Sequence, residues 1–336
     1  MSALRRLLAL FVILAVVACG GAGAPAPAAS SSATQAKPAK LVVGFSEIYE
    51  GALPMWYAAT KGVFTKHGLE VDLRYTASSS GIAALLSGET QIFQGGGSEV
   101  LSAVAGGEDL VVIGNLVPVY PYVFLVPADI KTAADLKGKR VGVSMPGSTS
   151  DIATRVALPA IGIDPDKDVT IVAVGSSQNR TAAMLAGSIQ GGLDQPPGSF
   201  ALEAKGFHIL FDMVSLKLPV VNNGITAKRA WLSANRDVAQ RYIDSLVETI
   251  SLLKSDKAGA EDVLKKELKI DDQKTLDGTY DASTKLFPSL PYARTEHFAD
   301  SLKVLTPKNP KLANFDVAKI LDESFVKSAG DRGLAK

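Results

Sequence analysis

Short polar side chains and glycines gather where predicted strands of this chain give way to helices. Hydroxyl groups and free backbone amides at such points bind the oxygen atoms of small polar or anionic molecules. In the earlier part of the chain the candidate ligand-binding residues are Ser46, Glu47, Tyr49, Leu53, Ser79, Gly96, Gly97 and Ser98. Further along they are Ser148, Thr149, Gln178, Arg180 and Gln195. We therefore expect a binding site assembled from loops that lie far apart in sequence.

Several of these residues also have a structural role that needs no ligand. The glycines that end in Gly97 can form a tight turn, and the serine-rich runs 148–150 and 176–178 can cap helices. A cap uses only some of the free amides of a helix N-terminus, so both roles are compatible. Arg180 can pair with an anion through its planar guanidinium group or form a surface salt bridge. We expect Arg180→Ala and Ser98→Ala to weaken binding and leave the stability of the unliganded protein nearly unchanged.

The sequence lacks the common signatures of catalytic and metal sites. It contains no Gly-x-Ser-x-Gly, phosphate-binding P-loop, Gly-x-Gly-x-x-Gly or His-Glu-x-x-His motif. His67, His208 and His297 are widely spaced, and Cys19 is the single cysteine, which excludes an intramolecular disulfide and a multi-cysteine metal site. We therefore expect a protein that is not an enzyme and has no metal and no cofactor.

The elements that position the candidate residues form a repeat. Val43-Gly44-Phe45-Ser46 is matched by Val141-Gly142-Val143-Ser144, and the run 83–88 is matched by 182–187 at nearly the same spacing. A strand–helix–strand–helix unit predicts a parallel sheet with right-handed crossovers. Open α/β sheets bind ligands at the carboxyl ends of their strands. The repeat therefore predicts an α/β fold with two lobes that face each other across a cleft.

The N-terminus has the pattern of an export signal. Arg5 and Arg6 precede the apolar run 7–17, which is too short to span a bilayer comfortably. The next residues resemble a bacterial lipobox that ends at Cys19; the alternative is an ordinary signal peptide with an incidental cysteine. We predict a signal peptide over 1–19, acylation of Cys19 and a flexible tether over 20–40. The protein would then be an exported, membrane-anchored lipoprotein in the periplasm or on the cell surface.

The remaining residues are numerous enough for two lobes. We predict a discontinuous first lobe over 41–124 and 220–336 and a second lobe over 125–219, so that two chain crossings form a hinge. The chain has 35 Lys and Arg, 34 Asp and Glu and a formal net charge of +1. This balance does not indicate nucleic-acid binding or membrane contact other than through the lipid. We expect a monomer.

Two runs resemble a known family. Pro54, Ala58-Ala59, Lys61-Gly62, Phe64 and His67-Gly68-Leu69-Glu70-Val71 resemble a segment of bacterial ABC-importer substrate-binding proteins, and Asp135 to Val143 resembles the opening of their second lobe. The group serves nitrate, alkanesulfonates, taurine and the pyrimidine precursor of thiamine. The resemblance covers nearly all of 41–253. It implies a two-lobed, type II periplasmic binding protein-like fold, each lobe a mostly parallel sheet flanked by helices, with a small-molecule ligand in the cleft between the lobes.

The resemblance also implies a function. The chain would be an extracytoplasmic solute-binding protein that delivers a small polar or anionic organic molecule to the permease subunits of an ABC importer. Alternatives are a lipid-anchored ligand sensor for a membrane partner, or an enzyme similar to the pyrimidine-precursor synthases, which carry a cysteine-rich segment absent here. The chain departs from the family at Gln91 and at 194–197. A sulfonate, nitrate, a neutral heterocycle or an aromatic acid all stay open, and Glu47 disfavours a bare anion if it points inward.

Overall fold

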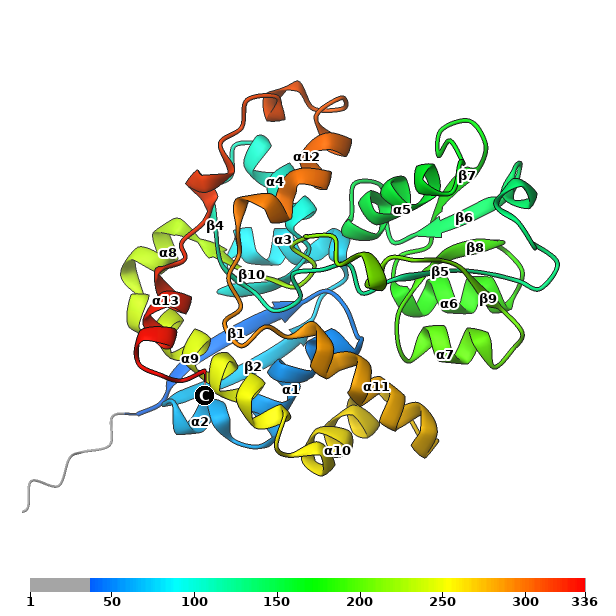
Figure 1. The fold of residues 1–336 in the computed structure, drawn as a ribbon. Helices are drawn as coiled ribbons and strands as arrows, with labels where there is room; N and C mark the ends of the chain where they lie inside the picture. The colour runs from blue at the N-terminus through cyan, green and yellow to red at the C-terminus, as the bar shows by residue number, and fades with distance from the viewer. Residues whose placement is uncertain (1–36, 336) are drawn as a thin grey trace, which may run out of the picture. The chain divides into compact units, whose positions relative to one another are not determined.

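Two mixed β-sheets organise the protein (Figure 1). The computed structural model describes residues 37–335, with the side chains of Ser78 and Ser79 left out. The predicted signal peptide, Cys19 and most of the predicted tether lie outside these residues. Residues 37–336 form one compact unit.

The first sheet has the strand order β2-β1-β3-β10-β4. Strand β1 pairs in parallel with β2 and β3, and β10 runs antiparallel to β3 and β4. Its strands are β1 (Ala39–Phe45), β2 (Leu69–Tyr75), β3 (Ile92–Gly95), β4 (Leu110–Asn115) and β10 (Gly224–Lys228). The helices α1 (Leu53–Thr60), α2 (Val63–Lys66), α3 (Ser78–Ser87) and α4 (Gly97–Ala105) belong to this part of the chain.

The second sheet repeats this topology with the order β7-β6-β8-β5-β9. Strand β6 pairs in parallel with β7 and β8, and β5 runs antiparallel to β8 and β9. Its strands are β5 (Val123–Val126), β6 (Arg140–Val143), β7 (Thr170–Ala173), β8 (Gly191–Asp194) and β9 (His208–Asp212), and its helices are α5 (Thr149–Ala160), α6 (Ser177–Leu185) and α7 (Gly198–Glu203). The two-sheet α/β fold predicted from the repeat is confirmed.

The repeated glycines have a local cause. Helix α3 ends at Gly88 with φ 83°, and Gly187 follows α6 with φ 70°. A left-handed backbone conformation after a helix favours glycine, which has no Cβ to clash. The same helix ending therefore occurs in both copies of the unit.

The two chain crossings lie side by side. Val119 in the first crossing forms an antiparallel bridge with Pro219 in the second. Val123 and Phe124, which we expected in the first lobe, lie in β5 and pair with β8 and β9 of the second sheet. Val123 and Phe124 therefore belong to the second sheet. The division of the whole chain into lobes stays a prediction.

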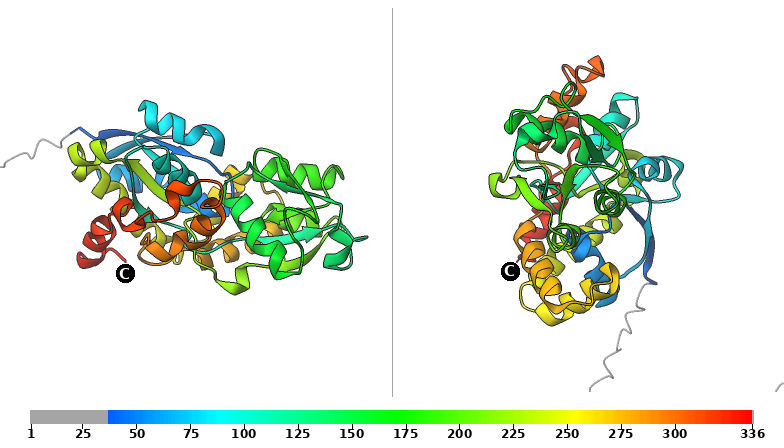
Figure 2. Two further views of the ribbon diagram at one scale, coloured as in Figure 1. Left: turned by 90° about the horizontal axis from the view of Figure 1, so that it is seen from above. Right: turned by 90° about the vertical axis from the view of Figure 1, so that its right-hand side faces the viewer.

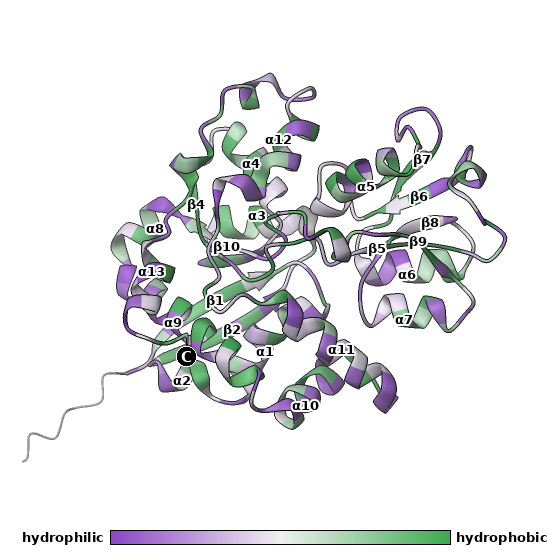
Figure 3. Ribbon diagram, viewed as in Figure 1, coloured by the Kyte–Doolittle hydropathy of each residue, from purple (hydrophilic) through white to green (hydrophobic). Residues whose placement is uncertain are grey.

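The C-terminal third of the chain is helical and lies with the first sheet (Figure 2). Its helices are α8 (Arg229–Ala234), α9 (Arg236–Leu253), α10 (Lys257–Leu268), α11 (Gln273–Leu286), α12 (Ala299–Leu305) and α13 (Ser324–Asp331). Short 3-10 helices are η1 (Glu50–Ala52), η2 (Ala133–Leu136), η3 (Val214–Leu216), η4 (Thr295–Phe298), η5 (Pro310–Leu312) and η6 (Val317–Ile320). In Figure 3 the hydrophobic colours follow β1, whereas hydrophilic residues concentrate on outer helices such as α11.

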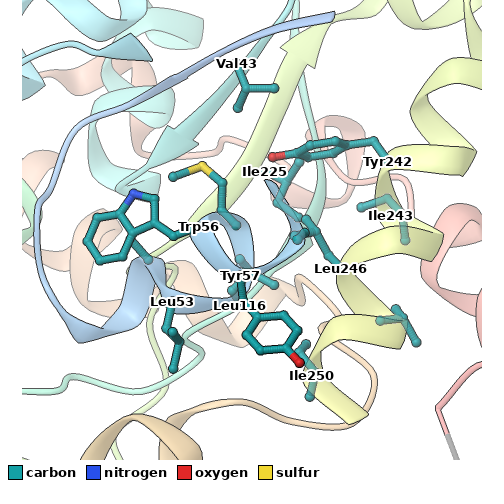
Figure 4. Close-up of a cluster of buried hydrophobic side chains, with 14 of the residues drawn as sticks. Val43, Leu53, Trp56, Tyr57, Leu116, Ile225, Tyr242, Ile243, Leu246 and Ile250 are labelled. Carbon is teal, nitrogen blue, oxygen red and sulfur yellow. The ribbon is translucent and has the colours of Figure 1, made fainter. Parts of the chain in front are cut away.

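The apolar side of α9 forms part of the largest core. Tyr242, Leu246 and Ile250 face Trp56 of α1 across this core (Figure 4). Burial of each such side chain stabilises the fold by about 1.5–3 kcal/mol relative to its exposure. Trp56 also packs edge to face on Phe45, with ring centroids 6.2 Å apart. Trp56 is therefore a member of the hydrophobic core.

Candidate ligand-binding cleft

Loops at the carboxyl ends of strands from both sheets meet at a cleft. Ser46 follows β1, Gly96 follows β3, Ser144 follows β6 and Gln195 follows β8. Parallel strands place their carboxyl ends at the same sheet edge, so these loops converge. One central cavity of the cleft is lined by Ser46, Glu47, Gly96, Glu99, Tyr122, Ser144, Ser148, Thr149, Ser150 and Asn222. The other central cavity is lined by Phe45, Ser46, Glu47, Tyr49, Ala52, Gln94, Gly95, Asn222 and Asn223.

The two central cavities are small because the walls are in contact. Each has a volume of about 10 Å³, roughly the space that one water molecule needs. The N-termini of α4 and α5 meet here: Ser98 Oγ and Thr149 Oγ1 lie 3.2 Å apart. Ser98 Oγ donates a hydrogen bond to Glu99 Oε2 over 2.8 Å, and Thr149 Oγ1 donates to the same oxygen over 3.4 Å. The structure is therefore that of a closed cleft.

Gly96 permits this close approach. A Cβ atom at this position would lie 2.0 Å from Thr149 Oγ1 and 2.3 Å from Glu99 Oε2. The role of Gly97 differs from our expectation, because its amide already donates to Val221 O over 2.9 Å and is not free for a ligand. The glycines therefore serve the close packing of the walls, and the expected run of free amides is wrong at Gly97.

A second contact between the walls involves the start of α6. Ser176 accepts a hydrogen bond from the amide of Asn179 over 3.1 Å, which confirms the predicted helix cap. The next residue, Ser177, donates from Oγ to Glu47 Oε2 over 2.9 Å. Gln178 Nε2 donates to the carbonyl oxygen of Ile48. Glu47 and Gln178 thus lie in the cleft, although in this closed form they bind protein groups.

Tyr122 and Asn222 line the cleft and were missed from the sequence. Tyr122 Oη donates to Asn222 Oδ1, and Asn222 Nδ2 donates to Tyr49 Oη, each over 2.9 Å. Asn223 Nδ2 donates to Gly51 O over 2.9 Å. Both asparagines belong to the second crossing, and Tyr122 ends the first. The pair Asn222-Asn223 within an otherwise apolar segment was the signal available in the sequence, and Tyr122 had none because it lies in an apolar run.

Arg180 forms the floor of the cleft on the side of the second sheet. It is 1% exposed, its Nε donates to Leu193 O, and its Nη1 lies 3.4 Å from Ser144 Oγ. Its methylene groups pack over Gly142 and Gly192. The predicted surface salt bridge is excluded by this burial. The side chain is a buried support of the cleft.

The charge of the Arg180 guanidinium acts on two acidic side chains, Glu47 and Asp194. Burial raises the pKa of Glu47 and of Asp194, and in both the charge of Arg180 opposes the shift. Burial also raises the pKa of Glu99, against the hydrogen bond from Ser98. Asp194 accepts from Thr181 Oγ1 over 2.5 Å and from the amide of Gln195 over 2.9 Å. Glu99 and Asp194 were not among the predicted residues, because an isolated acid in a sequence usually lies on the surface.

A larger cavity lies at the mouth of the cleft. Its volume is about 450 Å³, which is in the range of small-molecule sites. It brings together three predicted residues, Tyr49, Gln178 and Gln195, and Tyr49 also lines a central cavity. The other lining residues are Ile48, Ser177, Thr181, Ala182, Leu185, Asp194, Pro196, Pro197, Gly198, Glu267, Leu268 and Lys269. The end of α10 therefore contributes to the mouth, which the sequence did not suggest.

Gly97, Ser98 and Arg180 pack in the walls of the cleft but are not among the residues that line these cavities. Two further predicted residues do not join this arrangement. Leu53 is the first residue of α1 and has no exposed surface in the hydrophobic core, so it lines neither the central cavities nor the mouth. Ser79 lies in α3, and its side chain is outside the described residues. Ser148 caps α5 through a hydrogen bond from the amide of Asp151 and lines a central cavity as well.

The described residues 37–335 contain no group of three or more His, Cys, Asp or Glu side chains that could hold a metal ion. His67 pairs with Glu248 at 2.7 Å, and His297 lies elsewhere, 3.3 Å from Asn115. None of the helices within these residues has the length and apolar character that a membrane span requires.

Proteins of known sequence and structure are similar to this chain. A Brachyspira hyodysenteriae protein provisionally named an ABC transporter periplasmic binding protein is 30% identical over 161 residues, which are 48% of this chain and 43% of the relative. The chain spans less than half the length of the curated relatives it matches. A structure from Bordetella bronchiseptica RB50 has a TM-score of 0.75 at 22% identity, covering 88% of this chain and 98% of that one.

The periplasmic aliphatic sulphonate binding protein SsuA of Escherichia coli has the same fold. Its TM-score is 0.68 at 22% identity, covering 84% of this chain and 92% of that chain. The two-lobed periplasmic binding protein-like fold implied by the resemblance is therefore confirmed. The sequence profile of the NMT1/THI5-like family matches residues 51–256, more than half of the chain. The chain belongs to the NMT1/THI5-like family.

Proposed function

We propose that this protein is an extracytoplasmic solute-binding protein that captures a small polar organic molecule in its cleft and delivers it to an ABC importer. The observation that carries this proposal is the meeting of α4 and α5 at Ser98 and Thr149, which are 3.2 Å apart. Two helix N-termini from separate sheets oppose each other there. A ligand between them would bind both walls at once.

The proposed mechanism is closure of the two walls around the ligand. The crossings bridged at Val119 and Pro219 act as the hinge. Hydrogen bonds such as Ser177–Glu47 join the two walls in the closed form. A ligand that binds groups on both walls stabilises a closed form and shifts the population toward it. The closed form is then the state that a permease recognises.

The location and partners belong to the same proposal. Acylation of Cys19 anchors the exported chain to a membrane, the tether over 20–40 separates it from the bilayer, and a monomer meets the permease subunits. The lobe boundaries near the crossings define the moving parts. The name of the Brachyspira relative, an ABC transporter periplasmic binding protein, supports this assignment.

A binding role fits the chemistry of the cleft better than catalysis. The residues that line the central cavities and the mouth include no histidine and no cysteine. Within the described residues, no hydroxyl group that lines these cavities forms a hydrogen bond with an imidazole that would activate it; Ser177 Oγ bonds to Glu47, and Ser144 Oγ to Arg180. We therefore assign no catalytic step to this site.

A thermal-shift screen tests the proposal. The compact unit of residues 37–336 would be mixed with sulfonates, nitrate, pyrimidines, amino acids, amines and aromatic acids. A ligand at one hundred times its dissociation constant adds about 2.7 kcal/mol to the free energy of unfolding. This corresponds to a rise in Tm of about 5–10 °C. The absence of any shift, in protein shown by native mass spectrometry to carry no bound molecule, would contradict the proposed function.

A further inference from the structure

The charge of the cleft walls is the basis of a further inference. The residues that line the two central cavities include the carboxylates Glu47 and Glu99 and no lysine or arginine. Asp194 lies nearby and lines the mouth. The ionisable groups that line the central cavities are therefore acidic, and they present negative charge to an entering molecule when they are ionised.

Arg180 does not neutralise these walls. Its guanidinium is buried beneath Ser144 and donates to the carbonyl of Leu193, so part of its hydrogen-bonding capacity is already used. Its single positive charge acts on two acidic groups, Glu47 and Asp194, whereas Glu99 bonds to Ser98 and Thr149 instead. The cleft retains an excess of negative charge when those groups are ionised.

Helix N-termini attract anions, but the two that meet in this cleft already have carboxylates of their own. Glu99 lies in the first turn of α4, and Asp151 lies in the first turn of α5. Asp151 Oδ2 also accepts the amide of Gly147 over 2.8 Å. Acidic side chains in the first turn offset the positive end of the helix dipole. These termini consequently offer little attraction to a further anion.

A second, independent observation is the set of buried acceptors that lack partners. Gln94 Oε1 and Gln195 Oε1 receive no hydrogen bond within the described part of the chain, although their residues are only 2% and 3% exposed. Gln94 lines a central cavity and Gln195 lines the mouth. A buried acceptor without a donor costs free energy. A ligand that carries N–H groups would satisfy both atoms, whereas the oxygens of a nitrate or sulfonate would not.

We propose that the cleft binds a small organic cation, an ammonium or guanidinium compound with an apolar body, in preference to an anion. This inference rests on the proposed function and names the ligand class of the same site. The charged nitrogen lies between Glu47 and Glu99 and donates to Gln94. The apolar body extends past Tyr49, which lines both a central cavity and the mouth, toward Ile48 and Leu185.

The test compares ligands of similar shape and opposite charge. Butylamine, benzamidine and agmatine would be titrated calorimetrically into residues 37–336, alongside butanesulfonate and benzoate. We expect at least one cation to bind, and to bind at least about tenfold more tightly than the anion of similar shape. Anions that bind more tightly than cations would overturn the inference and leave the proposed function standing. Failure of every compound in the screen above would instead count against the proposed function.

Isosteric variants identify the groups responsible. Glu47→Gln and Glu99→Gln should each weaken binding of the cation about tenfold and leave binding of butanesulfonate equal or stronger. Glu108→Gln, an exposed acid outside the cleft, is the matched control and should bind like the wild type. Unchanged cation binding in both cleft variants would overturn the inference. The comparison of charges in the wild-type protein does not depend on whether either variant folds.

Discussion

Ser177 Oγ donates a hydrogen bond to Glu47 Oε2 over 2.9 Å, although the two residues lie 130 positions apart in the chain. One partner begins α6 beside the second sheet, and the other follows β1 of the first. Hydrogen bonds to charged groups contribute about 1.5–3 kcal/mol. This contact therefore favours the closed form even before a ligand arrives, and it makes closure measurable in the unliganded protein.

Removal of this hydrogen bond should open the cleft. In Ser177→Ala the Glu47 carboxylate loses its donor, and hydration of that carboxylate in an open form becomes more favourable. We expect a larger radius of gyration for the ligand-free variant in small-angle X-ray scattering, and weaker ligand binding. Ser188→Ala removes a serine hydroxyl that bonds within its own loop, to Ala183 O, and serves as the control. Identical scattering curves for Ser177→Ala and wild type would show that this bond does not hold the walls together.

Replacement of Arg180 should destabilise the whole protein. The sequence led us to expect unchanged stability for Arg180→Ala, but the side chain is 1% exposed and its charge offsets those of Glu47 and Asp194. Removing one partner from a buried charge arrangement costs about 3–5 kcal/mol. Urea denaturation should give a free energy of unfolding that is lower by that amount, seen as a lower midpoint at an unchanged slope. A variant as stable as the wild type would mean that the guanidinium is dispensable to the fold.

The pH dependence of stability should reveal the buried Glu50. Burial raises the pKa of this carboxyl well above its ordinary value of 4.5, and Oε2 has no hydrogen-bond partner within the described residues. The folded state therefore retains a proton that the unfolded state releases. Its contribution to stability is complete below the unfolded pKa and is lost as the pH rises through the folded pKa.

Glu50→Gln should remove this part of the pH dependence. The free energy of unfolding of the variant, measured by urea denaturation between about pH 5 and pH 8, should fall less steeply with pH than that of the wild type. Some slope should remain, because burial also raises the pKa values of Glu47, Glu99 and Asp194. Glu108→Gln should leave the slope unchanged. Parallel curves for Glu50→Gln and wild type would contradict a buried, protonated Glu50.

The repeat made the sheets predictable, because strand spacing and right-handed crossovers are local properties of the chain. The same reasoning placed Ser46, Ser148 and Gln195 at strand ends beside the cleft. It failed for Leu53, whose burial depends on the direction in which α1 leaves its loop. It also missed Asn222, because the position of a crossing relative to both sheets is set only when they pack together.

The missed acids have a related cause. Glu99 lies shortly after the end of β3 and Asp194 is the last residue of β8, but nothing in a single sequence distinguishes an acid in a cleft from one on the surface. The grouping of Glu47, Glu99, Arg180 and Asp194 arises because the segments after β1 and β3 of the first sheet approach α6 and the end of β8 of the second. The charge of the cleft, on which the proposed ligand class rests, therefore follows from the three-dimensional structure and not from the sequence alone.

Gly96 offers a direct test of how closely the walls must approach. In Gly96→Ala the new methyl group would lie 2.0 Å from Thr149 Oγ1 and 2.3 Å from Glu99 Oε2 in the closed form, so the contact between Thr149 and Glu99 must shift or the walls must separate. We expect ligand affinity to fall by about 1–3 kcal/mol, the usual cost of an inserted methylene in a packed site. The unliganded stability of each wall should change little, because an open cleft has room for the methyl group.

Adding Thr149→Ala to the Gly96→Ala variant should restore part of the ligand affinity. It removes the oxygen nearest to the new methyl group, so the double variant should bind more tightly than Gly96→Ala, whereas Thr149→Ala alone should bind more weakly than wild type. A double-mutant cycle measured by calorimetry gives this coupling energy as the departure from additivity. A coupling energy of zero would mean that the two positions do not meet in the ligand-bound protein, and that the ligand holds the walls farther apart than in the closed form described here.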